Sequence, residues 1–265
     1  MINNWIITGG CGFLGIALIN KLLKLGVTNI RIIDNLSVGS KNDLKNSCNF
    51  REINFSEITA SPNGLELIVG DILDPDLAVN VTKGCNIIAH LAANTGVQVS
   101  VKDPRADMLV NVIGTFNYLE AARINKVSKF IFASSGAPVG EVEPPIHEEI
   151  VPHPISPYGA SKLSGEGYCS VYNKTYGIET IILRFSNVYG PGSLNKSSVV
   201  AKFIQNALSD QLLEIYGDGT QTRDFIYIDD LIDAVISSSK SSKIGGETFQ
   251  IANNHETTIT EIKNL

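Results

Sequence analysis

The sequence predicts an α/β fold in which a doubly wound parallel sheet is followed by a smaller C-terminal α/β portion. Short runs rich in Ile and Val alternate with longer amphipathic stretches, which is the pattern of a parallel sheet covered on both faces by crossover helices. A glycine-rich turn joins the first of these runs to the first amphipathic stretch. Because the 265 residues are 43% hydrophobic and 18% charged, the chain can bury a large core.

Six apolar runs are expected to form the strands of this sheet. They are Trp5–Thr8, Asn29–Ile33, Leu65–Val69, Asn86–His90, Lys129–Ala133 and Glu179–Leu183. The helices expected between them are Phe13–Leu25, about Pro75–Thr82, Pro104–Ile124 and Pro157–Tyr176. Gly26 and Gly177 directly follow two of these helices, at the position where a glycine commonly ends a helix. The stretch Lys41–Ser61 is expected to be a loop-rich insertion.

The pattern changes after Gly190-Pro191-Gly192. A helix is expected at Val199–Leu208, strands at Leu212–Tyr216 and Arg223–Ile228, and a further helix from Asp229. We therefore predict two parts, a sheet domain of residues 1–185 and a substrate-binding portion of residues 186–265.

The end of the chain carries the start signal of one more helix. Thr258 precedes Glu261 by three residues, which is the spacing of a capping box. Because only four residues follow Glu261, we expect the C-terminal portion to be shorter than in related chains, or truncated.

Composition and charge restrict the class of partner. The net charge is −6 and no Lys/Arg cluster occurs, whereas a nucleic-acid surface needs a basic patch, so a small-molecule partner is expected. The four cysteines (Cys11, Cys48, Cys85 and Cys169) are far apart and form no CxxC pair, so neither disulfides nor a metal site is expected. The start of the chain does not resemble a signal peptide, and no apolar run reaches the roughly 18 residues of a membrane span. We expect a cytoplasmic protein.

The glycine-rich turn predicts a dinucleotide site of the Rossmann type. In Thr8–Gly15, Gly9 permits a tight turn, Gly12 lets the backbone approach a pyrophosphate, and Gly15 lets the helix pack closely on the strand. Asp34, at the end of the second strand, stands where this motif places a ribose-binding acid. A carboxylate there accepts hydrogen bonds from the ribose and repels a 2′-phosphate, so NAD is expected rather than NADP. The alternative is a glycine turn with an incidental acid.

A second constellation suggests proton transfer. Tyr158 and Lys162 lie four residues apart on the helix that begins at Ser156-Pro157, so they share one face. A phenol holds its proton to about pH 10, but a nearby ammonium favours the phenolate. Ser135 follows the strand Lys129–Ala133 at the edge where such sheets bind ligands. The alternative for Tyr158 and Lys162 is an ordinary surface pair.

Taken together, these residues resemble the extended short-chain dehydrogenase/reductases, in particular the NAD-dependent nucleotide-sugar epimerase/dehydratase family and its UDP-glucose 4-epimerase branch. The resemblance runs from the first strand to about Ala252. It rests on Thr8–Gly15, Asp34–Ser37, Asp71-Ile72, His90–Ala93, Asn111–Thr115, Tyr158–Lys162, Leu183–Pro191 and Arg223–Phe225.

The resemblance implies a role for each matching position. Ser135, Tyr158 and Lys162 would be catalytic, and Ser135, Asn187 and Arg223 would bind a UDP-sugar. Asn111 would support the geometry of the active site. The residues implied to bind NAD are Gly9, Gly12, Phe13, Leu14, Gly15, Asp34, Asn35, Ser37, Gly39, Asp71, Ile72, Leu91, Ala92, Ala93, Asn111, Tyr158, Lys162 and Ser186. Three alternatives stay open: Asp71 could cap a turn, the alanines could be small packing residues, and Asn111 could face solvent.

One departure from the family narrows the reaction. In the sugar 4,6-dehydratases an Asp-Glu pair follows the catalytic hydroxyl residue, and related decarboxylases place a Glu at the second of these positions. Here Gly136 and Ala137 follow Ser135, and neither side chain can transfer a proton. The resemblance therefore implies 4-epimerisation of a UDP-hexose, in which a 4-keto sugar forms and receives the hydride on its other face.

Two other functions remain open at this stage. A nucleotide-sugar ketoreductase would use the same Ser135, Tyr158 and Lys162. A non-catalytic NAD-binding regulatory protein would be expected to have lost at least one of them. The long helices Pro104–Ile124 and Pro157–Tyr176 resemble those that pair across dimers in this family, so we expect a homodimer.

Overall fold

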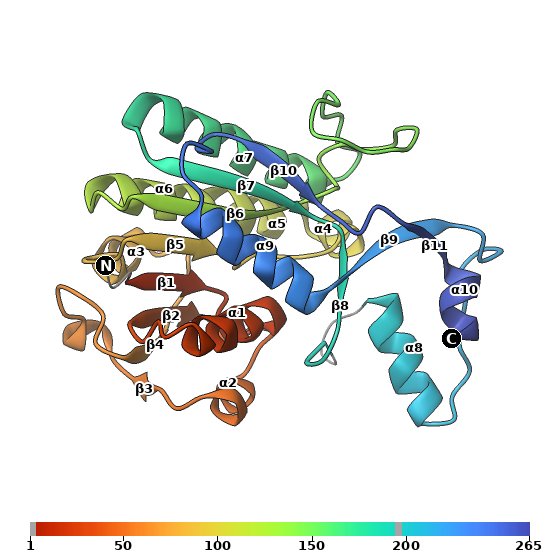
Figure 1. The fold of residues 1–265 in the computed structure, drawn as a ribbon, viewed down its shortest axis with the longest axis horizontal. Helices are drawn as coiled ribbons and strands as arrows, with labels where there is room; N and C mark the ends of the chain where they lie inside the picture. Colours follow the sequence, from red (N-terminus) through yellow and green to blue (C-terminus); the bar gives the residue numbers. More distant parts are fainter. Residues whose placement is uncertain (1–3, 194–197) are drawn as a thin grey trace.

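The structure is a computed structural model that describes residues 4–193 and 198–265. The start of the chain, residues 1–3, lies outside the described residues. Its main element is a parallel sheet with the strand order β10-β7-β6-β5-β1-β2-β4-β3 (Figure 1). The bounds are β1 (Trp5–Thr8), β2 (Ile30–Asp34), β3 (Arg51–Glu52), β4 (Leu65–Val69), β5 (Ile87–His90), β6 (Lys129–Ser135), β7 (Glu179–Phe185) and β10 (Thr248–Ile251). The six predicted strands are confirmed. β6 and β7 extend further than predicted, to Ser135 and Phe185.

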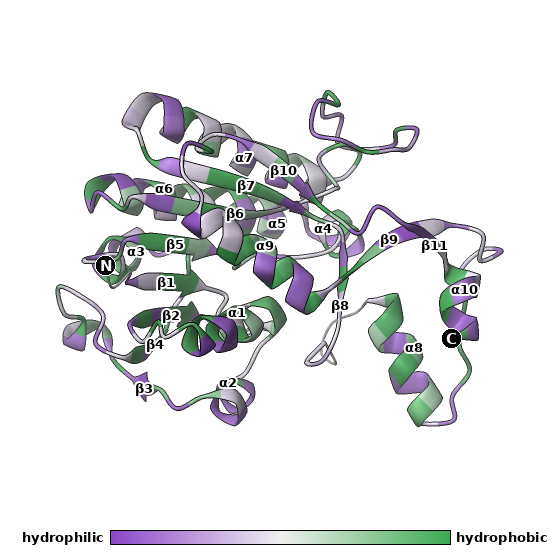
Figure 2. Ribbon diagram, viewed as in Figure 1, coloured by the Kyte–Doolittle hydropathy of each residue, from purple (hydrophilic) through white to green (hydrophobic). Residues whose placement is uncertain are grey.

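Helices cover both faces of this sheet because successive strand residues point to opposite sides. Ile7 packs in the core under α1 (Phe13–Lys24) and α9 (Ile228–Lys240), whereas its neighbour Ile6 packs in the second core. The helices over that second core are α3 (Pro75–Val81), α6 (Thr115–Ile124) and α7 (Pro157–Tyr176). Figure 1 shows α1 and α9 on one side of the strands, and Figure 2 shows apolar residues along the strands themselves. The doubly wound prediction is confirmed.

The predicted helix Pro104–Ile124 is interrupted by a wider π-helical turn. It consists of α5 (Pro104–Met108), the π segment Leu109–Gly114 and α6. A Cβ on Gly114 would lie 2.4 Å from Ile72 Cδ1, so this glycine lets the helix pack closely against the segment that follows β4. A short helix, α4 (Val97–Lys102), precedes it and was not predicted.

The structure differs from the expectation in two segments, one expected to be loop-rich and one expected to be a strand. The stretch Lys41–Ser61 contains α2 (Lys41–Ser47), the strand β3 and a 3-10 turn at Phe55–Glu57. Residues 211–215 form no strand: Leu212 is 92% exposed, and Asn206 Nδ2 donates to its carbonyl oxygen at 2.9 Å. Both segments carry few buried apolar side chains, so the hydrophobic pattern is weak there.

The C-terminal part of the chain contributes to both sheets. A small second sheet contains β8 (Asn187–Tyr189), β9 (Thr222–Tyr227) and β11 (Glu256–Thr258), with α8 (Val199–Leu208) beyond it. However, α9 and β10 return to the large sheet, where β10 pairs with β7. The tail helix α10 (Ile259–Asn264) is confirmed, with both hydrogen bonds of the Thr258/Glu261 capping box. The domain boundary at residue 185 stays a prediction.

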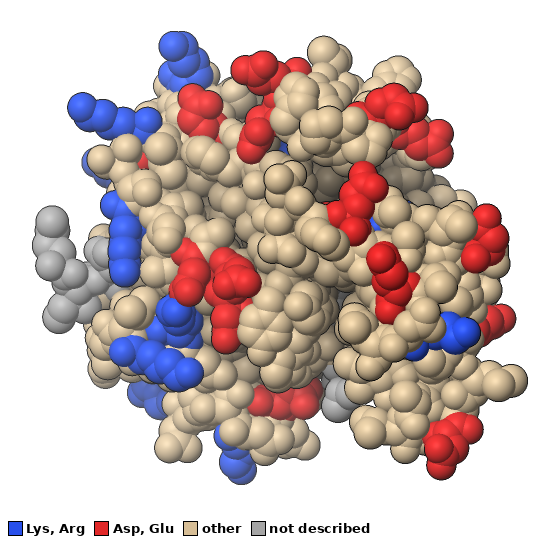
Figure 3. Space-filling model, turned by 45° about the vertical axis from the view of Figure 1, so that its right-hand side comes forward, with Lys and Arg blue, Asp and Glu red and all other residues tan. Residues whose placement is uncertain are grey.

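Neither a membrane-spanning helix nor a group of metal ligands is found among the described residues. None of the helices in residues 4–193 and 198–265 is long and apolar enough to cross a bilayer. In the same ranges, no group of His, Cys, Asp and Glu could hold a metal ion. On the face drawn in Figure 3, Lys and Arg gather at the left edge while Asp and Glu are spread over the remainder.

Candidate active site

The predicted site residues meet at the carboxyl edge of the large sheet. β1 lies between β2 and β5, so the strand order reverses there, and a doubly wound sheet binds its ligand at such a reversal. The glycine-rich turn follows β1, Asp34 ends β2, and Ser135 ends β6. The sheet thus brings together motifs that are far apart in the sequence.

The glycine-rich turn has the close contacts that its sequence predicts. Gly9 has φ +70°, and a Cβ there would lie 2.9 Å from the backbone of Ala92. A Cβ on Gly15 would lie 2.4 Å from Gly9 O, so α1 packs directly on the turn. The N-cap residue Gly12 provides no side-chain cap, and the helix therefore presents its N-terminal dipole to the site without a side chain in between. Phe13, Leu14 and Gly15 form the first turn of this helix.

Asp34 joins the glycine-rich turn to the loop after β2. Its Oδ2 accepts from Cys11 N and its Oδ1 from Leu36 N, each at 2.8 Å, and the residue is buried. Each oxygen keeps a further lone pair that a ribose hydroxyl could use. Gly39 belongs to the same loop, and a Cβ there would lie 2.1 Å from Cys11 O. Ser37 is exposed on this loop.

Asn35 and Asp71 lie side by side at the ends of β2 and β4. Asn35 Nδ2 donates to Asp71 Oδ2 at 3.1 Å, and Asn35 Oδ1 accepts from Ser37 N. Asp71 also accepts from Leu73 N at 2.9 Å, so it does close the local turn that the sequence left as an alternative. Ile72 is 6% exposed, and its carbonyl oxygen accepts from Asn117.

The end of β5 forms another wall of the same edge. Leu91 N donates to Thr8 O, and Ala92 N donates to Thr8 Oγ1 at 3.2 Å. Leu91, Ala92 and Ala93 are all half-buried. Ser186, after β7, donates its hydroxyl to Asp224 O at 2.7 Å and so links the two sheets.

Ser135, Tyr158 and Lys162 are brought together by the packing of α7 on β6. Ser156 caps the helix by accepting from Gly159 N, and a Cβ on Gly159 would lie 2.6 Å from Ala137 O. This close approach places the first turn of α7 against the segment after Ser135. Lys162 Nζ donates to Ala133 O at 2.8 Å and lies 5.9 Å from the centre of the Tyr158 ring.

The electrostatics of this cluster differ from the expectation. Burial raises the pKa of Tyr158 to about 12, although a hydrogen bond with Ser135 lowers it. Burial also lowers the pKa of Lys162 to about 8. The protein alone therefore does not favour the phenolate, because Lys162 directs its ammonium to a backbone carbonyl and burial weakens its charge. A further positive charge at the site would lower the pKa of Tyr158 and favour its phenolate.

Asn111 is buried rather than facing solvent. Its amide nitrogen lies within hydrogen-bond distance of Asn94 O, Asp107 Oδ1 and Ser161 Oγ, at 2.9 to 3.1 Å, and its oxygen accepts from Asn94 N. These bonds hold the loop after β5 against the first turn of α7. Asp107 was not among the predicted site residues, although it lies four residues before Asn111 on a predicted helix and so shares its face.

His90 was noted only as part of a motif, yet it connects β1 to the start of α6. Thr115 Oγ1 donates to Asn111 O, so it accepts from His90 Nε2 at 3.1 Å. A neutral imidazole with its proton on Nε2 has an acceptor at Nδ1. Thr8 Oγ1, which accepts from Ala92 N, therefore donates its own proton to His90 Nδ1 at 3.0 Å. In agreement, burial lowers the pKa of His90 to about 3.

The two predicted substrate residues lie on the small sheet and are exposed. Asn187 Nδ2 donates to Asp224 O at 3.0 Å, and Arg223 donates to Thr222 O. The Asp224 carboxylate accepts from Asn253 N and His255 N and thereby holds the strand ends together.

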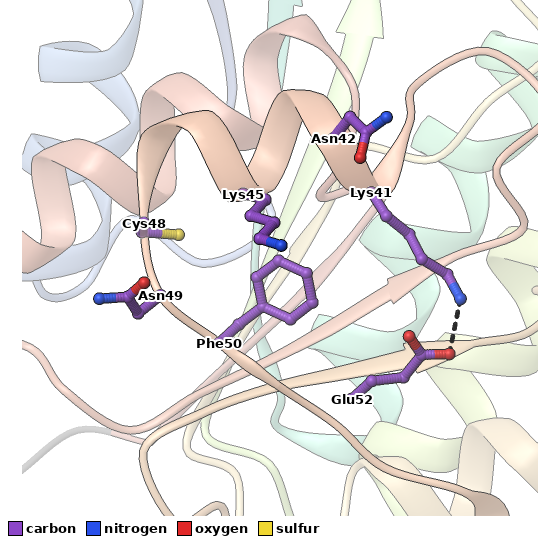
Figure 4. Close-up of a pocket in the computed structure, with 7 residues that line it drawn as sticks. All are labelled: Lys41, Asn42, Lys45, Cys48, Asn49, Phe50 and Glu52. Carbon is purple, nitrogen blue, oxygen red and sulfur yellow. Dashed lines mark hydrogen bonds and ion pairs between the residues drawn. The ribbon is translucent and has the colours of Figure 1, made fainter.

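A hollow beside α2 contains none of the predicted site residues. It is lined by Lys41, Asn42, Lys45, Cys48, Asn49, Phe50 and Glu52 (Figure 4). Lys41 and Glu52 pair across it at 2.6 Å, and burial raises the pKa of the Cys48 thiol. Glu52 therefore neutralises one of the two lysines that line the hollow, and the Cys48 thiol is not activated.

The comparisons with known proteins point to one family. The model of the NAD dependent epimerase/dehydratase family matches residues 5–252. The putative UDP-glucose 4-epimerase of Methanocaldococcus jannaschii is 37% identical over 97% of this chain and 79% of its own length.

Two solved structures share the fold. A UDP-N-acetylglucosamine 4-epimerase of Methanobrevibacter ruminantium, in complex with UDP-N-acetylmuramic acid, is 32% identical with a TM-score of 0.88, over 100% of this chain and 81% of that one. The UDP-glucose 4-epimerase of Thermus thermophilus, in complex with NAD, is 30% identical with a TM-score of 0.85, over 98% and 81%.

Proposed function

The chain belongs to the NAD-dependent epimerase/dehydratase family, and we propose that it is a 4-epimerase acting on UDP-hexoses of the UDP-glucose/UDP-galactose type. As a member of this family, the chain is an NAD-dependent enzyme that acts on nucleotide sugars. The observation that carries the proposal is the segment Ser135-Gly136-Ala137, which joins a catalytic hydroxyl to two residues without an ionisable group.

The residues of the proposed NAD site fit the cofactor. The uncapped N-terminus of α1 accepts a pyrophosphate, the glycines exclude side chains from the turn, and Asp34 offers lone pairs to a ribose. The chemistry that bound NAD supplies is the reversible acceptance of a hydride, and its positive ring also favours the Tyr158 phenolate.

In the proposed reaction, Tyr158 accepts the proton of the sugar 4-hydroxyl and returns it in the reverse step. Ser135, which hydrogen-bonds Tyr158, holds the same sugar oxygen, and Lys162 stabilises the phenolate. The sugar leaves with the opposite configuration at C4 when the keto intermediate is reduced on its other face. No net oxidation occurs.

Elimination of water would need more acid–base groups than this segment has. A Cβ on Gly136 would meet no atom within 4 Å, so no side chain from another element occupies that space. Expelling water across C5 and C6 needs a separate acid and base beside the sugar. Gly136 and Ala137 supply neither, which favours epimerisation over dehydration.

The test is incubation of the full chain with a panel of UDP-sugars, without added cofactor, followed by product separation. Interconversion of UDP-glucose and UDP-galactose is expected, and preference for an N-acetylated or uronic pair would revise the sugar only. Stoichiometric consumption of added NADH with a keto-sugar would favour a ketoreductase. If the NAD-loaded protein interconverts no pair of 4-epimers, the proposal is wrong.

Asp34 is proposed to select NAD. Changing Asp34→Ser is expected to weaken NAD binding by about tenfold to a hundredfold, because charge-assisted hydrogen bonds to the ribose are lost. The preference over NADP should fall at the same time, since the repulsion of a 2′-phosphate disappears. Calorimetric titration of both cofactors measures this, with the exposed Asp76→Ser as a control. Unchanged affinity for both cofactors would remove Asp34 from the site.

We also propose a homodimer formed through the helices α5, α6 and α7. Exposed apolar side chains lie on these helices and on the π segment, including Met108, Ile113, Ile124 and Val171. Such a surface is typical of an interface with a second copy. Val171→Arg is expected to produce monomers in light scattering, whereas Val151→Arg, in an exposed loop, should leave the dimer intact. A monomeric parent protein would contradict the proposal.

A further inference from the structure

Asp107 is a buried carboxylate at the active site that the mechanism above does not use. It is 1% exposed and lies on α5, next to α7. Its Oδ1 accepts from Asn111 Nδ2 at 3.0 Å, whereas its Oδ2 has no hydrogen-bond partner among the described residues. A buried acceptor without a partner destabilises the fold, and more so when it is charged. Such a group calls for a function that outweighs this cost.

A short chain of hydrogen bonds connects Asp107 to Tyr158. The Asn111 amide that donates to Asp107 also lies 3.1 Å from Ser161 Oγ. Ser161 Oγ in turn donates to Tyr158 O at 3.0 Å. On the other side, Ser100 Oγ accepts from Tyr158 N at 3.1 Å. The backbone of Tyr158 is thus bonded to Ser100, which precedes α7, and to Ser161 on α7 itself, which Asn111 contacts.

The charge of Asp107 acts on Lys162, one turn after Tyr158. Burial lowers the pKa of Lys162, and Asp107 is the strongest of the groups that raise it. Glu166, the other acid beside Lys162, is already paired with Arg184 at 2.7 Å. The remaining titratable neighbours are neutral, because burial raises the pKa of Cys169 and lowers that of His90. Burial raises the pKa of the Asp107 carboxyl itself, whereas the charge of Lys162 lowers it. In the described part of the chain, the ionised Asp107 is therefore the acid beside Lys162 that no cation pairs with directly.

We propose that Asp107 is a positioning residue whose buried carboxylate keeps the Lys162 ammonium protonated, while Asn111 and Ser161 link it to the turn that carries Tyr158. This inference rests on the proposed function, since it assigns Asp107 to the same reaction. The negative charge of Asp107 raises the pKa of both Lys162 and Tyr158.

The first experiment measures Lys162 directly in the full chain. The ¹³C signal of its ε-methylene is followed against pH by NMR and assigned through its loss in Lys162→Met. In Asp107→Asn the midpoint is expected to fall by roughly one pH unit. Asp210→Asn makes the same change at an exposed position and should leave the midpoint in place. An unchanged midpoint in folded Asp107→Asn overturns the proposal.

The second experiment follows the rate of UDP-sugar interconversion against pH. Both limbs of the profile are expected to move to lower pH in Asp107→Asn, because the pKa values of Tyr158 and Lys162 fall together. A loss of rate with both limbs in place would show a merely structural role and overturn the proposal. The thermal midpoint should not fall, since the amide removes an unpaired buried charge and still accepts from Asn111.

Two provisions keep the test decisive. If Asp107→Asn does not fold, Asp107→Ser replaces it, because a hydroxyl also accepts from Asn111 without carrying charge. If the parent protein interconverts no UDP-sugar, the proposed function fails, whereas the Lys162 midpoint still decides the role of Asp107. The two failures are therefore distinguishable.

Discussion

Changing Tyr158→Phe is expected to lower kcat for UDP-sugar interconversion by about 10²–10⁴-fold, the usual contribution of a positioned acid–base group. The ring would keep its place, because its backbone is bonded to Ser100 and Ser161 and the first turn of α7 packs against Ala137. Only the hydroxyl that moves the proton is lost. Binding of the UDP-sugar, measured by calorimetry, should therefore change little.

The control for this variant lies on the same helix. Tyr168→Phe removes a phenol from an exposed position of α7 and should leave kcat unchanged. The pH profile adds a second readout. Burial disfavours the Tyr158 phenolate and bound NAD favours it, so the rate of the NAD-loaded parent enzyme should increase with pH over the range in which the phenolate forms. A Tyr158→Phe enzyme that kept both its rate and this limb would show that another group moves the proton.

Six strands of the large sheet were predictable because each one is a buried, Ile/Val-rich run between amphipathic helices. Trp5–Thr8 and its neighbours are buried on both faces, and the periodicity of the sequence expresses that directly. Short elements had no such signal. The short elements α4 and β8 depend on tertiary contacts that the sequence pattern does not show. Leu212 is apolar and was therefore predicted to be part of a strand, although it is exposed.

The motifs of the site were visible in the sequence, whereas the network that supports them was not. Gly9, Asp34 and Lys162 belong to spaced patterns with a physical meaning. The burial of Asn111 depends on the π turn, which rotates the helix relative to a regular 3.6-residue repeat. The role of His90 depends on hydrogen bonds over 82 and 25 residues of chain. That of Asp107 depends on a carboxylate oxygen without a partner among the described residues, and no local pattern encodes either.

The largest expected loss of stability comes from Arg31→Met. Arg31 is fully buried on β2, and its Nε donates to Glu66 Oε2 on β4 at 2.9 Å. Its other nitrogens donate to the carbonyl oxygens of Val81, Lys83 and Thr59 at 2.7 to 3.1 Å. The guanidinium thus joins the sheet to the end of α3 and to the loop before β4. Methionine fills the volume but leaves a buried acid and three carbonyls without this donor, so we expect a loss of about 3–5 kcal/mol.

Arg51→Met is the matched control, because Arg51 donates to the same carboxylate at 3.0 Å but is 57% exposed. Water replaces that bond readily, so its loss should cost about 0–1 kcal/mol. Urea unfolding of both variants measures the difference. Equal losses of unfolding free energy in the two variants would mean that burial does not set the strength of the two arginine contacts to Glu66. In that case the Glu66 carboxylate would be held by its bond from Asn63 N instead. A large loss confined to Arg31→Met would show that the β2–β4 edge, which carries Asp34 and Asp71, depends on one buried guanidinium for its stability.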